Sequence, residues 1–206
     1  GIGDGVQPKG NAIPIARDAV VLIVSKNCKI PEVTSKEYAV NAPTIRQLFA
    51  TGYAKENLMV YTLDKHSGSR RFFVNTFAEN GTPMPISNKA TTVATDIAMV
   101  ENVAGDPYGI GYCSAAFADP DRVRLLDFKD AKDQKYHYPN DNPKYATVLP
   151  DNPTWPLTRT LYVAYGGKAW REDGSGIANV MLAPGGTGTQ ALHDGPLFKA
   201  SYYLPK

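Results

Sequence analysis

The chain has few of the residues that build metal centres. Its 206 residues include only two cysteines, Cys28 and Cys113, and three histidines, at positions 66, 137 and 193. A structural zinc site needs four Cys or His ligands, normally grouped at short spacings along the chain. These five residues are scattered instead. We therefore expect no metal site and no cofactor.

Charge of one sign is also lacking, as are long apolar runs. The chain carries 22 basic and 20 acidic side chains, mixed along its length, and its formal net charge is +2. Nucleic-acid binding normally leaves a concentrated basic patch, and a membrane-spanning helix needs about 20 apolar residues in succession. We expect neither a nucleic-acid partner nor a membrane span. The 43% hydrophobic content is enough to bury a core.

The two cysteines leave two interpretations open. In an oxidising compartment Cys28 and Cys113 are able to form one disulfide. Both follow apolar, strand-like runs, where an unpaired buried thiol is equally common.

Hydrophobic patterning predicts strands and helices in mixed order, which is typical of an α/β fold. The run Ala19 to Val24 predicts a strand covered on both faces, as in a parallel sheet. Pro43 and Gly52 bracket a predicted helix, and Ser87 or Asn88 is expected to cap a longer one reaching Val103. Further strands are predicted at 58–61, 108–113, 123–128 and 161–165, a polar surface excursion at 129–156, and short helices at 177–182 and 187–193.

The most informative segment runs from the predicted strand at 58–61 through a hydroxyl-rich turn into a helix. Ser67 is placed to cap a helix whose inward face carries Phe73 and Phe77. The first turn of such a helix offers unpaired backbone N–H groups, and the helix dipole favours an anion there. Gly68 permits close approach, and Ser69 adds a second hydroxyl. An ordinary serine cap on an amphipathic helix explains the same pattern, so both interpretations stay open.

Catalytic motifs do not fit this segment. A serine hydrolase would use Ser67 as nucleophile, but the G-x-S-x-G pattern is absent and His66 is badly placed as its base. The glycine-rich stretch 185–189 lacks the lysine of a phosphate loop. We expect the protein not to be an enzyme.

Several segments together resemble one protein family. They are residues 13–27, 44–52, the turn Ser67-Gly68-Ser69-Arg70, residues 109–112, and then 155–162 with 182–186. In this order and spacing they are similar to the later part of the phosphate-binding proteins of bacterial ABC transporters, which have the type 2 periplasmic binding protein fold.

The resemblance implies an α/β protein with one complete lobe, residues 19–155, and an incomplete first lobe, residues 1–18 and 156–206. It implies a non-catalytic solute-binding protein for phosphate or a similar small oxyanion, feeding an ABC transporter or sensor. Ser67, Gly68, Ser69 and Arg70 would bind the ligand, and a transporter permease would be the partner. The expected location is periplasmic or extracellular, with a signal peptide removed.

Two departures from the family favour an alternative. Leu63 stands where the family has an arginine, so a bidentate clamp on phosphate is lost unless Lys65, His66 or Arg70 compensates. The N-terminal segment that supplies further ligand groups in the family is also missing. The alternative is an interaction or structural module that keeps the fold without the oxyanion, as a homodimer or a subunit.

Overall fold

The computed structural model describes residues 12–30, 39–52, 58–129, 136–137 and 157–164. Its helices are α2 (Ala42–Thr51), α3 (Gly68–Thr76), α4 (Asp96–Gly105) and the short 3-10 helix η1 (Ala115–Phe117). Its strands are β1 (Ala12–Ser25), β2 (Ala39–Val40), β3 (Met59–Leu63), β4 (Thr91–Val93), β5 (Gly109–Ser114), β6 (Val123–Leu125), β7 (Asp127–Lys129), β8 (Tyr136–His137) and β9 (Thr158–Ala164). The mixture of helices and strands confirms the α/β class.

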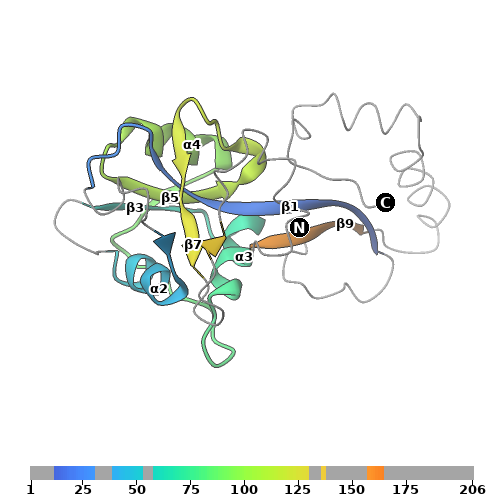
Figure 1. Ribbon diagram of the computed structural model, residues 1–206. Helices are drawn as coiled ribbons and strands as arrows, with labels where there is room; N and C mark the ends of the chain where they lie inside the picture. The colour runs from blue at the N-terminus through green and yellow to red at the C-terminus, as the bar shows by residue number, and fades with distance from the viewer. Residues whose placement is uncertain (1–11, 31–38, 53–57, 130–135, 138–156, 165–206) are drawn as a thin grey trace.

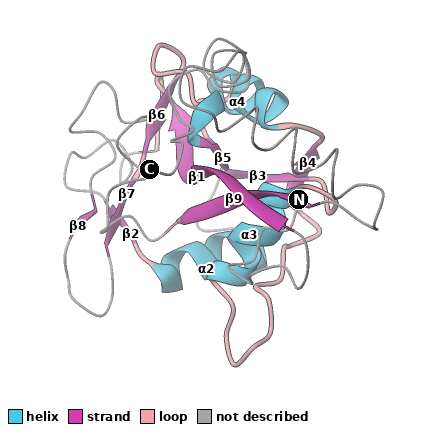
Figure 2. Cartoon of the chain, turned by 90° about the vertical axis from the view of Figure 1, so that its right-hand side faces the viewer, coloured by secondary structure: helices cyan, strands magenta, loops and turns pink. Residues whose placement is uncertain are grey.

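The main sheet has the strand order β4-β3-β5-β1-β6, and β9 also pairs with β1. Strand β3 runs parallel to β4 and β5, whereas β1 is antiparallel to β5, β6 and β9. The run Ala19 to Val24 is fully buried as expected, but the expected parallel pairing was wrong. Its burial comes from helices on both faces: α4 covers one side, and α2 with α3 covers the other (Figures 1 and 2). A separate small sheet has the order β2-β7-β8.

The two halves of strand β1 pair with different strands. Its second half lies in the sheet, while its first half pairs with β9, from Ala12 opposite Ala164 to Ala19 opposite Thr158. The two strands extend together away from the sheet, and this paired segment is called the β1–β9 ribbon below (Figure 1). The register shifts between Pro14 and Ala16, because proline has no N–H to donate to the ladder.

Helices α2 and α3 begin after capping residues, and α2 ends at Gly52 as expected. Asn41 accepts a hydrogen bond from the backbone N–H of Thr44 at the start of α2, and Gly52 ends that helix in the left-handed conformation with φ of 66°. Ser67 caps α3 in the same way. The buried face of α3 presents Phe73, whose ring stacks on Tyr112 of β5 with centroids 4.0 Å apart. This contact packs α3 against the sheet.

The expected helix cap at Ser87 or Asn88 was wrong. Helix α4 begins later, after the cap Thr95, and the Ser87 hydroxyl instead accepts from the Lys89 N–H in a turn. The β-branched run Thr91–Val93 forms β4, which pairs parallel with β3. The single strand expected at 123–128 is likewise divided into β6 and β7.

Cys28 and Cys113 are both free thiols, so the disulfide interpretation does not hold in this structure. Cys113 is buried, and burial raises its pKa well above the ordinary thiol value. Among the described residues, no helix has the length and apolar character to cross a membrane, and no group of His, Cys, Asp or Glu side chains is arranged to hold a metal ion. The helices expected at 177–182 and 187–193, and most of 129–156, lie outside the described residues.

Candidate functional site

The turn between β3 and α3 is shaped by its own polar residues. Asp64 accepts the backbone N–H of His66 on its side chain at 2.9 Å and the N–H of Ser67 on its carbonyl at 2.9 Å. Ser67 Oγ then accepts the N–H of Arg70 at 3.3 Å. These bonds fix the chain as it leaves the sheet and set the direction of α3.

Two backbone donors remain at the start of α3. The N–H groups of Gly68 and Ser69 occupy the first turn and have no hydrogen-bond partner among the residues that the structure describes. The Ser67 hydroxyl uses its oxygen for the Arg70 N–H, which leaves its proton available. Three donors therefore converge at the positive end of the helix dipole.

Among the described residues of the turn itself, no cation takes the place of the arginine that the resembling family has at the position of Leu63. Leu63 is fully buried in the core, so that position presents no charge. Arg70 donates through Nη1 to the Leu63 carbonyl at 3.0 Å, which holds its guanidinium against the end of β3. Lys65 and His66 are exposed, and the structure gives neither side chain a contact that would aim it at the start of α3.

Ser69 belongs to a buried polar network rather than to the open turn. Its hydroxyl accepts a hydrogen bond from Arg159 Nη2 at 3.0 Å and also bonds the carboxyl group of Asp96. Arg159 reaches it from β9. Of the two serine hydroxyls proposed from sequence, only that of Ser67 stays available to a ligand.

The network continues from Arg159 to Asp18 of β1. Arg159 donates to Asp18 Oδ2 through Nε at 2.9 Å and through Nη2 at 2.7 Å. The Ser114 hydroxyl donates to the other oxygen of Asp18 at 2.7 Å, and the Ser114 N–H donates to Asp96 Oδ1 at 2.7 Å. The network thus joins the β1–β9 ribbon to the first turns of α3 and α4.

Burial controls the acidity of both carboxyl groups. It raises the pKa of Asp18 above the ordinary value, and the charge of Arg159 opposes that rise. Burial also raises the pKa of Asp96, while the N–H of Ser114 opposes it. The side chain of Arg159 is only 8% exposed, and Asp18 is fully buried. Such a pair is costly to separate, because each member alone would be a buried charge.

Sequence reasoning missed this network. One signal was present: Asp18 is a charged residue directly before a continuous apolar run, where a buried partner is required. Nothing local identified Arg159 as that partner.

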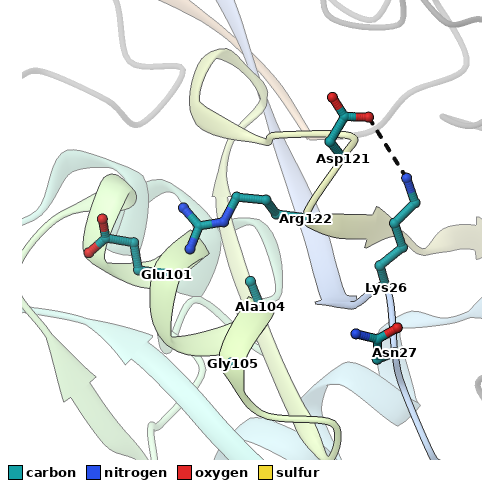
Figure 3. A pocket seen from close by; sticks show the side chains of 7 residues that line it. All are labelled: Lys26, Asn27, Glu101, Ala104, Gly105, Asp121 and Arg122. Atoms are coloured by element: carbon teal, nitrogen blue, oxygen red, sulfur yellow. Dashed lines mark ion pairs between the residues drawn. The ribbon is translucent and has the colours of Figure 1, made fainter.

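A depression with a volume of about 320 Å³ lies at the C-terminal end of α4 (Figure 3). It is lined by Lys26, Asn27, Glu101, Ala104, Gly105, Asp121 and Arg122. Lys26 and Asp121 form an exposed ion pair across it at 3.9 Å. Both signs of charge are present and no group of donors converges, so the start of α3 is the better candidate site.

Comparison with known proteins supports the fold. No protein-family model matches the chain, and no curated protein matches its sequence. Solved structures do match it: an ABC-type phosphate transport receptor from Vibrio cholerae is 12% identical, with a TM-score of 0.62 over 97% of this chain and 75% of that one.

Two further structures are similar. A protein from Clostridium perfringens, described as a phosphate ABC transporter substrate-binding protein with bound phosphate, is 16% identical, with a TM-score of 0.69 over 98% of this chain and 78% of that one. PstS from Borrelia burgdorferi is 14% identical, with a TM-score of 0.57 over 95% of this chain and 72% of that one. The chain therefore has an α/β fold like that of periplasmic binding proteins.

Proposed function

We propose that the protein is a non-catalytic solute-binding protein that holds phosphate or a similar small oxyanion at the start of α3. The observation that carries this proposal is the convergence of three donors: the N–H groups of Gly68 and Ser69, unpaired among the described residues, and the hydroxyl of Ser67. An oxyanion accepts several hydrogen bonds at once, and the helix dipole adds to its binding.

The same geometry favours binding over catalysis. The hydrogen bond recorded at Ser67 Oγ comes from the Arg70 N–H, and the structure gives this oxygen no bond to an imidazole or a carboxylate among the described residues. A serine nucleophile needs such a base within hydrogen-bond distance. The hydroxyl is therefore suited to donate to a ligand rather than to attack one.

The wider role is supported by the solved structures of similar fold, which are described as phosphate transport receptors and substrate-binding proteins. By analogy, residues 19–155 form the second lobe, and residues 1–18 with 156–206 belong to the first. The ligand then lies between the lobes, the β1–β9 ribbon forms the hinge, and an ABC transporter permease or a sensor is the partner. This role places the protein in the periplasm or outside the cell.

Isothermal titration of the ligand-stripped protein with phosphate, sulfate and molybdate tests the proposal. We expect saturable binding of at least one anion. Ser67→Gly should weaken it, because glycine keeps an acceptable helix cap but lacks the hydroxyl. Ser87→Gly, which removes a hydroxyl from a turn elsewhere, is the matched control. Absence of binding heat with all three anions in the wild-type protein would overturn the proposal.

One observation favours the alternative of an interaction module. The position that carries a clamping arginine in the resembling family is here a leucine packed in the core. Such a module would give no heat with any anion and would elute as a dimer or within a complex in size-exclusion chromatography. Anion binding by a monomer excludes it.

A further inference from the structure

We propose that Arg159 supplies the guanidinium for the anion at the start of α3, in place of the charge that Leu63 does not provide. The inference rests on the proposed function and specifies which cation contacts the ligand. It assigns a binding role to a residue of β9, which is far from the turn in sequence.

The first support is the hydrogen bonding of Arg159. Its Nε and Nη2 atoms donate to Asp18 and Ser69. Its Nη1 atom has no hydrogen-bond partner among the described residues, although the side chain is only 8% exposed. A guanidinium carries five N–H donors, so the donors of Nη1 stay available to an acceptor.

The second support is where Nη1 lies. A Cβ atom placed on Gly68 would be 3.8 Å from Nη1 of Arg159, which is its nearest neighbour within 4 Å. Nη1 therefore lies beside Gly68, the first residue of α3, on the side where glycine leaves space. An oxyanion in this space can accept from Nη1 and from the helix at the same time.

The guanidinium is also held rigidly. Asp18 fixes one edge of the guanidinium, Ser69 accepts from Nη2, and the ring of Phe72 lies beneath it with its centroid 5.5 Å from Cζ. Arg70, the other nearby arginine, is held by the Leu63 carbonyl. A preorganised donor loses little conformational entropy when it binds an anion.

A purely structural role for Arg159 makes a different prediction from a binding role. If Arg159 only compensates the buried charge of Asp18, loss of either residue should disturb the site to a similar degree. If Arg159 contacts the anion, Asp18 competes with that anion for the same cation. Removing the charge of Asp18 should then leave a stronger anion site.

Titration calorimetry with inorganic phosphate, and with sulfate in parallel, separates these roles. We expect Arg159→Gln to weaken binding about 10- to 100-fold, the loss of one hydrogen bond to a charged group. Asp18→Asn, whose Oδ1 still accepts from Arg159, should bind more tightly than the wild type. The double variant D18N/R159Q, which leaves no lone buried charge, should bind as weakly as R159Q and guards against misfolding of the single variant.

Arg46→Gln is the matched control, since Arg46 bonds the carbonyls of Phe77 and Ala78 at the other end of α3. It should bind like the wild type. Equal weakening in D18N and R159Q, or wild-type affinity in R159Q, overturns this inference while leaving the proposed function intact. Absence of binding in the wild-type protein overturns the proposed function itself.

Discussion

Asp18 and Arg159 lie 141 positions apart in the chain, yet Oδ2 of the first and Nη2 of the second are 2.7 Å apart inside the protein. The pair is the point where the β1–β9 ribbon meets the first turns of α3 and α4 through Ser69 and Ser114. The stability of the protein and the proposed anion site therefore involve the same few side chains.

The first prediction concerns the stability that this pair protects. Arg159→Met should lower the free energy of unfolding by about 3 to 5 kcal/mol, because it leaves Asp18 buried and unpaired. Urea denaturation followed by circular dichroism measures the change. D18N/R159M, which removes both charges, should recover part of the loss.

Lys26→Ala provides the comparison for that experiment. Lys26 and Asp121 form an ion pair whose side chains are 54% and 95% exposed. Exposed pairs contribute about 0 to 1 kcal/mol. A loss in Arg159→Met no larger than in Lys26→Ala would show that Asp18 is not buried as described.

The second prediction concerns the contact between β5 and α4. A Cβ atom on Gly111 would lie 2.5 Å from Met99 Sδ and 3.0 Å from Val103 Cγ2. Gly111→Ala should therefore destabilise the protein by about 1 to 3 kcal/mol through overpacking. Gly105→Ala, at a glycine of α4 with no atom within 4 Å of the added Cβ, should be neutral or stabilising by up to about 1 kcal/mol. The midpoint temperature of thermal unfolding should therefore fall in Gly111→Ala and stay unchanged or rise in Gly105→Ala.

The third prediction is a pH dependence from Asp96. Burial raises its pKa in the folded protein, whereas the unfolded chain titrates near 3.9. The folded state then binds the proton more tightly, so the free energy of unfolding falls as pH rises from about 4 until the raised pKa is passed. Asp18, whose pKa is raised as well, contributes a slope of the same sign.

Asp96→Asn removes one of these two contributions. Asparagine keeps an Oδ1 acceptor for the Ser114 N–H but does not titrate. Urea denaturation between pH 4 and pH 7 should show a shallower fall in stability for D96N than for the wild type. Parallel curves would mean that Asp96 has an ordinary pKa in the folded protein.

What the sequence predicted well was local. Gly52 and Ser67 set helix ends through a backbone angle or a hydrogen bond within a few residues, so each could be recognised from its neighbours. The α/β class and the buried strand at Ala19 to Val24 follow from apolar patterning. Ser87 is a residue type that often caps helices, but the chain after it forms β4 instead. That strand depends on pairing with β3, which is distant in the chain.

In the candidate site, too, the local features could be predicted from the sequence and the long-range contacts could not. The turn at Ser67 and Gly68 was found from sequence, because a helix start is a local feature. The use of the Ser69 hydroxyl could not be predicted, since Arg159 and Asp96 reach it from other elements. Long-range polar pairing follows from the tertiary fold, and no spacing rule in one sequence specifies it.

The last prediction tests the space beside Gly68. The Cβ atom of Gly68→Ala would be 3.8 Å from Nη1 of Arg159, an ordinary contact, so the variant should fold with wild-type stability or better. The methyl group nevertheless occupies the space beside Nη1 in which we propose that the anion lies. Phosphate affinity should fall at least about tenfold, which corresponds to about 1.4 kcal/mol.

Calorimetric titration of Gly68→Ala beside Gly105→Ala, an alanine substitution with no atom near the added Cβ, checks this result. Unchanged affinity in Gly68→Ala would place the anion outside the space between α3 and Arg159. A loss of affinity without a loss of stability is specific to occupancy of that space, because a general disturbance of α3 would lower both. Gly68 is therefore the position at which binding and folding are most cleanly separated.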